Sequence, residues 1–148
     1  MKFSFGSSKI KSKEKQTILF VCIQNAGRSQ MAEGFFRKYA SENYEPLSAG
    51  TKPTSKINPM AIQVMEEVGI DISKQRPKDL TEDMMRNSTK IINMGCMKKD
   101  WCPTMFVPNR VDWGIEDPKG KPIEKIREIR DEIEQRVKGL TASIPKEN

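Results

Sequence analysis

Short apolar runs alternate along the chain with stretches in which apolar residues recur every three or four positions. The runs predict strands at residues 17–22, 44–49, 90–94 and 111–113, the first being the continuously apolar "TILFVC". The wider spacing predicts helices at about residues 29–40, 59–68, 81–86 and 121–140. This alternation predicts an α/β fold, in which right-handed crossovers place helices against a parallel sheet.

Capping residues and the closing helix support this assignment. Asn58 and Pro59 are typical of a helix start, and Gly69 is placed to end that helix. The closing helix carries one apolar stripe, formed by Ile123, Ile126, Ile129, Ile133, Val137 and Leu140. We therefore expect this helix to pack one of its faces on the core.

Length and composition indicate one soluble domain. The chain has 148 residues, of which 36% are hydrophobic and 31% charged, and no apolar run approaches the ~20 residues of a membrane-spanning helix. The opening segment lacks the apolar centre of a secretory signal. We expect residues 1–16 to be a disordered basic tail, residues 17–148 to form the domain, and the protein to be a cytoplasmic monomer without a membrane partner.

The net charge of +6 raises the question of nucleic-acid binding. Most of this charge lies in the tail, where five lysines precede Gln16 and Glu14 is the one acidic residue. The rest of the chain is nearly balanced. A solvated tail is therefore favoured over a nucleic-acid site.

The junction between the first strand and the first helix, "CIQNAGRS", carries the main candidate site. Backbone N–H groups of such a loop, together with the positive end of the helix dipole, can surround a tetrahedral anion. Arg28 adds a planar guanidinium suited to two oxygens of a phosphate-like group. The oxyanion-binding residues predicted here are Ile23, Gln24, Asn25, Ala26, Gly27 and Arg28.

Cys22 ends the first strand at this junction and is predicted to be a nucleophile. The positive field of the loop should lower the pKa of its thiol, and Ser29 can donate a hydrogen bond to the sulfur. Alone, Cys22 would suit a buried structural cysteine and Arg28 a surface residue. Their Cys-x5-Arg-Ser spacing at a strand-to-helix junction favours catalysis. A Walker-type phosphate loop is excluded because its Gly-Lys-Ser/Thr ending is absent.

The segment "VCIQNAGRSQMAEGFF" resembles the loop of thiol-dependent arsenate reductases built on the low-molecular-weight tyrosine phosphatase fold, and the similarity continues through "LSAG", "MGC", "CP" and "WGIEDPKG", over about residues 17–140. The resemblance implies a three-layer α/β/α fold with a four-stranded parallel sheet in the order 2-1-3-4. It also implies Cys22 as nucleophile, Arg28 as anion clamp and Asp117 as acid. Family phosphatases usually have Pro after Arg-Ser, whereas Gln30 and "MAEG" follow the reductase pattern.

Asp117 is a candidate acid on chemical grounds as well. A thiolate that displaces oxygen from arsenate or a phosphate ester leaves a poor leaving group until a proton arrives, and the chain has no histidine to supply one. Asp117 and Pro118 follow the last predicted strand, at the edge of the sheet where Cys22 is expected. The alternative is an ordinary Asp-Pro turn.

The other two cysteines distinguish a reductase from a phosphatase. A phosphatase needs only Cys22, whereas a reductase must supply two electrons. Cys96 can attack the adduct of Cys22 with arsenic, releasing arsenite and forming a disulfide, and Cys102 can then attack Cys96. The alternative is a pair of half-buried loop cysteines or metal ligands. We predict no metal site, because three cysteines without histidine fall short of the usual zinc sets.

Two features depart from the better-known reductases. Those proteins read Cys-Thr-Gly-Asn-Ser-Cys-Arg-Ser at the loop, and their interval matching Cys96 to Cys102 is one residue longer.

The resemblance implies thioredoxin as the reductant, with a low-molecular-weight thiol as the alternative, and no tightly bound cofactor. Some relatives bind a monovalent cation behind the loop, through positions matching Asn25, Glu33, Ser48 and Asp79.

The sequence thus predicts reduction of arsenate to arsenite by a three-cysteine relay, with phosphate as a competing anion and arsenic detoxification as the role. One alternative is a phosphatase that acts on phosphotyrosine or a small phosphate ester through Cys22, Arg28 and Asp117. The other is a non-catalytic module that binds an anion or senses arsenic.

Overall fold

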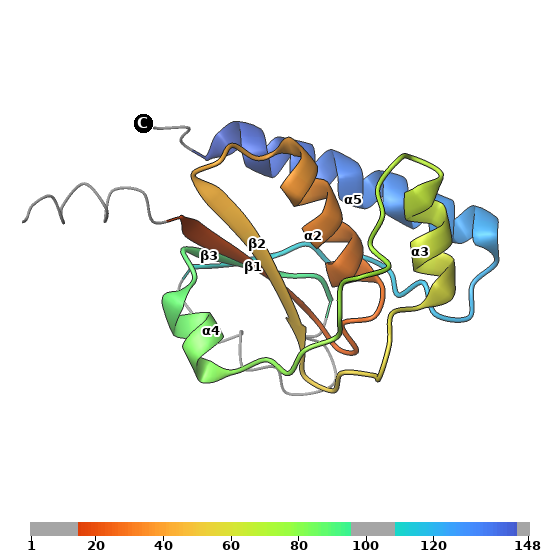
Figure 1. Ribbon diagram of the computed structural model, residues 1–148, viewed down its shortest axis with the longest axis horizontal. Coiled ribbons are helices and arrows are strands. Elements are labelled where there is room, and N and C mark those ends of the chain that lie inside the picture. The colour runs from red at the N-terminus through yellow and green to blue at the C-terminus, as the bar shows by residue number, and fades with distance from the viewer. Residues whose placement is uncertain (1–14, 96–108, 145–148) are drawn as a thin grey trace, which may run out of the picture.

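A computed structural model describes residues 15–95 and 109–144, in which helices are interspersed among the strands (Figure 1). Its strands are β1 (Gln16–Cys22), β2 (Tyr44–Gly50), β3 (Lys90–Asn93) and β4 (Arg110–Asp112). Its helices are α2 (Arg28–Tyr39), α3 (Pro59–Glu66), α4 (Glu82–Asn87) and α5 (Ile123–Ser143). The strands form one parallel sheet in the order β2-β1-β3-β4, which confirms the predicted fold and strand order.

Strand β1 lies inside the sheet, paired with β2 on one side and β3 on the other. Its residues from Ile18 to Cys22 are all buried. A continuous apolar run is needed here because both faces of the strand are covered. Cys22 pairs in register with Gly50, the last residue of β2, so two strand ends meet at one edge of the sheet.

Helices cover both faces of the sheet. α2 and α5 pack on each other over one face with α3 beside them, and α4 lies on the opposite face (Figure 1). On the first face, Phe20 and Phe36 belong to the larger core, which includes the apolar stripe of α5. On the other face, Leu19 and Val21 form a smaller core with Met84 of α4 packed against it. Alternate residues of β1 therefore contribute to both cores.

The two ends of α3 follow the capping residues of the sequence. Asn58 Oδ1 accepts a hydrogen bond from the Met60 N–H (2.9 Å), and Gly69, at φ +84°, follows the last turn of α3. The helix ends at Glu66 rather than at residue 68, because the Val68 and Gly69 N–H groups bond to carbonyls only three residues back. The other boundaries lie within a few residues of those predicted.

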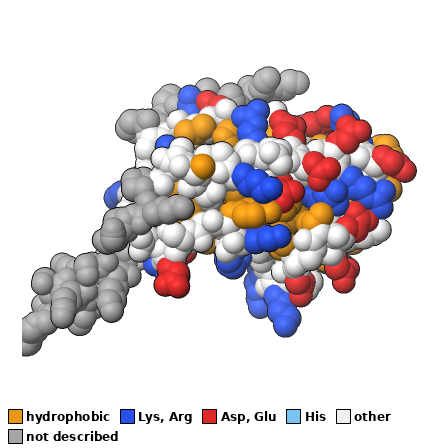
Figure 2. All heavy atoms as spheres, turned by 90° about the horizontal axis from the view of Figure 1, so that it is seen from above, with side chains coloured by type: hydrophobic (Ala, Val, Ile, Leu, Met, Phe, Trp, Pro, Cys, Tyr) orange, Lys and Arg blue, Asp and Glu red, His pale blue; other side chains and the backbone are white. Residues whose placement is uncertain are grey.

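The described residues can be compared with the expectations about membrane spans, surface charge and the basic tail. Among residues 15–95 and 109–144, no helix is long and apolar enough to cross a bilayer. Acidic and basic side chains are interspersed over the face seen in Figure 2, as the near-balanced charge of the chain after the tail leads one to expect. The predicted tail lies outside the described residues except for Lys15 and Gln16, and Gln16 already belongs to β1.

Candidate active site

The loop between β1 and α2 folds around the sulfur of Cys22. This side chain is buried, and its Sγ lies 2.9 Å from Ser29 Oγ and 3.3 Å from the backbone nitrogen of Asn25, which donates to it. Ser29 belongs to the first turn of α2. The end of the central strand and the start of the helix therefore meet at this one sulfur.

Asn25 holds the loop in its curved form. It is fully buried and has φ +52°, in the left-handed region that asparagine tolerates better than most residues. Its Nδ2 donates to Ser29 Oγ (2.7 Å), and its Oδ1 accepts from the Lys78 N–H (2.8 Å). Gln30 Nε2 donates to its carbonyl oxygen (2.9 Å). Hydrogen bonds from three directions therefore organise the loop before any anion binds.

The segment that connects β2 to α3 turns carbonyl groups of the loop to one side. The Lys52 N–H donates to the carbonyl oxygen of Ile23 (2.8 Å), and the Asn58 N–H donates to that of Ala26 (2.9 Å). A trans peptide directs its N–H opposite to its C=O, so the N–H groups of these peptides point the other way. Such an arrangement leaves N–H dipoles for an anion rather than carbonyl dipoles.

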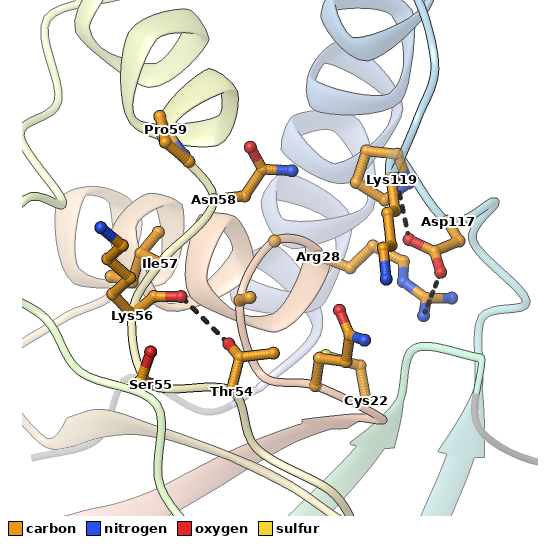
Figure 3. Close-up of a pocket in the computed structure, with 14 residues that line it drawn as sticks. Cys22, Arg28, Thr54, Ser55, Lys56, Ile57, Asn58, Pro59, Asp117 and Lys119 are labelled. Atoms are coloured by element: carbon orange, nitrogen blue, oxygen red, sulfur yellow. Dashed lines mark hydrogen bonds and ion pairs between the residues drawn. The ribbon is translucent and has the colours of Figure 1, made fainter.

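Arg28 lies at the edge of the pocket with its guanidinium held in place. It is buried, its Nη1 donates to the carbonyl oxygen of Ile115 (2.9 Å), and its Nη2 lies 3.9 Å from Asp117 Oδ2. Asp117 is exposed and accepts from the Lys119 N–H (3.0 Å). Figure 3 shows the side chains of Arg28 and Asp117 directed toward one another, near Cys22. The structure thus brings together these three predicted site residues.

Two glycines permit close contacts around this site. A Cβ at Gly50 would lie 2.5 Å from the carbonyl oxygen of Ile23, so β2 can touch the loop only because no side chain intervenes. A Cβ at Gly95 would lie 2.5 Å from Arg28 Nη1. Residues at the ends of β2 and β3 must therefore be small for the loop and its arginine to keep their positions.

The predicted resolving thiols, Cys96 and Cys102, lie outside the described residues, so their place in the relay stays a prediction. Cys22 is the cysteine that the structure describes, and it is a free thiol. Within the described parts of the chain, no group of three or more histidine, cysteine or acidic side chains could hold a metal ion.

The pocket at Cys22 is small and partly basic. It measures about 240 Å³, below the usual size of pockets for drug-like ligands. Its walls come from the loop, from residues 54–59 and from residues 117–119, and no described residue in them is aromatic. The Lys119 side chain points into it beside Arg28 (Figure 3). Its size and charge suit a small oxyanion.

Residues 54–59 form a wall of the pocket that no sequence motif predicts. Only a loop and a helix start are predicted there, since the segment carries no catalytic motif. Their position alone indicates a role at the site, because they follow β2 and precede α3 at the carboxyl edge of the sheet, where ligands bind in such folds.

A second polar cluster lies around the buried carboxylate of Glu33. Ser48 Oγ donates to Glu33 Oε1 (2.6 Å), and Arg37 Nη2 lies 2.9 Å from Oε2. Lys78 Nζ lies 3.9 Å from Oε1. Burial lowers the pKa of Lys78, and the attraction of Glu33 opposes this shift.

This cluster does not fit a bound monovalent cation. Asn25, Glu33 and Ser48 are buried, whereas Asp79, the fourth matching position, is exposed. Asn25 Oδ1 already accepts from the Lys78 N–H, and Glu33 Oε1 already has the Ser48 hydroxyl and the Lys78 ammonium beside it. The chain thus supplies its own positive charge at this place.

The parallel sheet and the Cys-to-Arg loop at its edge are those of a protein of the phosphatase-like class. A comparison with known families agrees, since the model of the low molecular weight phosphotyrosine protein phosphatase family matches residues 17–148. The chain belongs to this family, which confirms the fold-level resemblance seen in the sequence.

Proteins similar to this chain include arsenate reductases. The arsenate reductase of Brevibacillus brevis is 39% identical over 125 residues, which cover 84% of this chain and 92% of that protein. A solved arsenate reductase in a phosphate-binding state is 34% identical, with a TM-score of 0.79, covering 88% of this chain and 99% of the other. A thioredoxin-dependent arsenate reductase of Corynebacterium glutamicum is 37% identical, with a TM-score of 0.74, covering 92% of this chain and 65% of the other.

Proposed function

We propose that this protein reduces arsenate to arsenite, with Cys22 as nucleophile and the loop N–H groups and Arg28 as the anion cradle. One observation carries the proposal: the Cys22 sulfur is held by Ser29 at a small, basic pocket with no aromatic residue in its described walls. Arsenate has the shape and charge that such a cradle binds. The relatives named arsenate reductases support this choice of substrate.

The first step is a displacement at arsenic. The Cys22 thiolate forms a bond to arsenic while an arsenic–oxygen bond breaks, and the oxygen leaves as water after Asp117 supplies a proton. Arg28 and the loop stabilise the charge on the remaining oxygens. The 3.9 Å approach of Arg28 to Asp117 supports this division of labour, because the two side chains lie at one edge of the pocket.

The electrons for reduction come from the other two thiols. The Cys96 thiolate attacks Cys22 Sγ, the new disulfide forms, and arsenic departs as arsenite with the electron pair of its bond to sulfur. The Cys102 thiolate then attacks Cys96 and releases Cys22 as a thiolate. An external dithiol reduces the Cys96–Cys102 disulfide.

We assign the role of external reductant to a thioredoxin, with a low-molecular-weight thiol as the alternative. The thioredoxin-dependent relative from Corynebacterium glutamicum supports this assignment. We place the protein in the cytoplasm, because a relay of free thiols needs a reducing compartment. We also propose that it is a monomer and has no tightly bound cofactor.

A coupled assay tests the proposal against a phosphatase. Incubation with arsenate, thioredoxin, thioredoxin reductase and NADPH should give arsenate-dependent loss of NADPH absorbance, and Cys22→Ser should abolish it. Rapid hydrolysis of p-nitrophenyl phosphate with no NADPH loss would favour a phosphatase. The structural neighbours include such an enzyme from T. tengcongensis, 25% identical with a TM-score of 0.78.

A trapping experiment tests the relay itself. Cys102→Ala should complete one turnover and stop with a Cys22–Cys96 disulfide, which mass spectrometry of peptides would detect. Repeated turnover by this variant would exclude Cys102 as the resolving thiol. A non-catalytic sensor would give arsenate-dependent effects that survive Cys22→Ser, and that result would overturn the enzymatic assignment.

A further inference from the structure

The carboxylate of Glu33 is buried yet has no part in the proposed chemistry. It lies on α2, one helical turn after Ser29, and only 8% of its side chain is exposed. A buried carboxylate is costly without a compensating positive charge. Arg37, which is largely exposed, pairs with Oε2 on the solvent side. Lys78 Nζ approaches Oε1, the oxygen that also accepts from Ser48.

Lys78 contacts both this carboxylate and the loop. Its backbone N–H donates to Asn25 Oδ1 (2.8 Å), while its ammonium lies 3.9 Å from Glu33 Oε1 and donates to the carbonyl oxygen of Arg76 (2.8 Å). Its own carbonyl accepts from the Gly50 N–H (2.8 Å). One residue therefore joins α2, the end of β2 and the loop.

A chain of hydrogen bonds leads from Lys78 to the reacting sulfur. Asn25, held by Lys78, donates to Ser29 Oγ (2.7 Å), and Ser29 Oγ lies 2.9 Å from Cys22 Sγ. A shift of Lys78 would release Asn25 Oδ1 and, with it, the orientation of the amide that holds Ser29.

We propose that Lys78 is a positioning residue whose ammonium takes the place of a bound monovalent cation beside Glu33 and so keeps Asn25 and Ser29 aligned on Cys22. The inference rests on the proposed role of Cys22 as the reacting thiol, and on the disagreement between this cluster and a cation site. It follows that the reactivity of Cys22 and its affinity for oxyanions do not depend on K⁺ in this protein.

The test compares Lys78→Met with Lys78→Arg, which keeps the charge, and with Lys74→Met, a control at an exposed lysine of the same segment. Alkylation of Cys22 by iodoacetamide is followed by mass spectrometry of its peptide, with and without inorganic phosphate as a protecting anion. Each protein is measured in K⁺ and in the bulky tetramethylammonium ion at equal ionic strength. Circular dichroism establishes that each variant is folded.

Wild type and Lys74→Met should react equally in both salts. In tetramethylammonium, the alkylation rate of Cys22 in Lys78→Met should be roughly tenfold lower than in wild type, because a buried carboxylate oxygen loses its cation. The protection of Cys22 by phosphate should weaken by a similar factor. K⁺ should restore part of this loss, because the ammonium no longer occupies the place beside Glu33 Oε1, and Lys78→Arg should show little of it. The double variant Glu33→Gln/Lys78→Met should lose the dependence on K⁺, because no buried charge remains to attract a cation.

Three outcomes would overturn the proposal: a wild-type protein that needs K⁺, a Lys78→Met variant that matches the Lys74→Met control, or a loss that neither K⁺ nor arginine corrects. The wild-type measurement decides the first outcome even if Lys78→Met does not fold. None of these measurements requires arsenate turnover. A failure of the coupled arsenate assay would therefore count against the proposed function, and the alkylation experiment on the Lys78 variants could still be interpreted.

Discussion

Ser29 Oγ lies 2.9 Å from Cys22 Sγ and at the same time accepts a hydrogen bond from Asn25 Nδ2 (2.7 Å). A hydroxyl has one proton to donate, and the amide of Asn25 already supplies a donor to the Ser29 oxygen. A thiolate has no proton to donate, so Ser29 is the donor of this contact whenever Cys22 reacts as a thiolate. Such a hydrogen bond would favour the ionised sulfur that the proposed chemistry requires.

Replacement of Ser29 should make this effect measurable. In Ser29→Ala the sulfur loses its hydroxyl donor, and we expect Cys22 alkylation at neutral pH to slow by about tenfold, the value of a hydrogen bond to a charged group. The matched control is Ser73→Ala, at an exposed serine outside the loop. Equal alkylation rates in the two variants would mean that the main-chain donors alone stabilise the thiolate.

A methyl group at Gly50 should displace the loop. The added Cβ would lie 2.5 Å from the carbonyl oxygen of Ile23, so Gly50→Ala should lower the free energy of unfolding by about 1–3 kcal/mol. Gly139→Ala in α5 is the control, because its Cβ meets nothing within 4 Å and alanine favours helix by about 1 kcal/mol. Urea denaturation should therefore move the two variants in opposite directions, and phosphate protection of Cys22 should weaken only in the first. Equal changes in the free energy of unfolding of the two variants would contradict the close contact between Gly50 and Ile23.

Much of this fold could be predicted because its signals are local. β1 is a continuous apolar run, Asn58 and Pro59 begin α3, and α5 carries an unbroken apolar stripe. The loop could be predicted for the same reason, since Cys22 and Arg28 flank a single junction and need no distant partner to be recognised. The family resemblance then supplied the strand order, which the structure confirms.

The contacts behind the loop could not be predicted in this way. Lys78 is 53 positions from Asn25, and its segment has no hydrophobic period that would place it in space. Its main-chain N–H, rather than its side chain, makes the contact with the loop, and sequence patterns do not report backbone hydrogen bonds between loops. The resemblance to relatives matches the fourth cation position to Asp79, whereas in the structure the ammonium of Lys78 lies beside Glu33.

An ion-pair cluster between α3 and α5 should make stability depend on pH. Glu67, just after α3, accepts two hydrogen bonds from Arg127 (3.0 and 2.8 Å) and one from Arg130 (2.9 Å). The bond from Arg127 is the main cause that lowers the pKa of Glu67, with Arg130 adding to it. A carboxyl whose pKa is lowered by folding stabilises the protein above its unfolded value and loses this contribution as the pH falls through the folded value.

Glu67→Gln should therefore have a lower melting temperature than wild type at neutral pH, with the difference closing in acid. Differential scanning calorimetry at several pH values measures this, and Glu66→Gln, an exposed neighbour, serves as control. A gap of the same size at every pH would show that the charge of Glu67 does not contribute. This site lies away from the pocket, so phosphate protection of Cys22 should not change.

Substitutions of Asp117 and Arg28 should distinguish an effect on the reaction rate from an effect on anion binding. Asp117→Asn removes the proposed proton donor but keeps a side chain of the same shape, so arsenate-dependent NADPH loss should fall by roughly 10²- to 10⁴-fold. Phosphate protection of Cys22 should persist in this variant, because the loop and Arg28 remain. Arg28→Lys loses the planar fork and the bond to the Ile115 carbonyl, so its phosphate protection should weaken by about tenfold or more.

The contrast between the two variants is decisive because both residues lie at one edge of the pocket, 3.9 Å apart. If Asp117→Asn weakened phosphate protection as strongly as Arg28→Lys, the carboxylate would act by holding the guanidinium rather than by giving a proton. A proton donor acts on the leaving oxygen only in the first displacement. Single-turnover formation of arsenite should therefore slow in Asp117→Asn, while reduction of a preformed Cys96–Cys102 disulfide by thioredoxin should keep its wild-type rate.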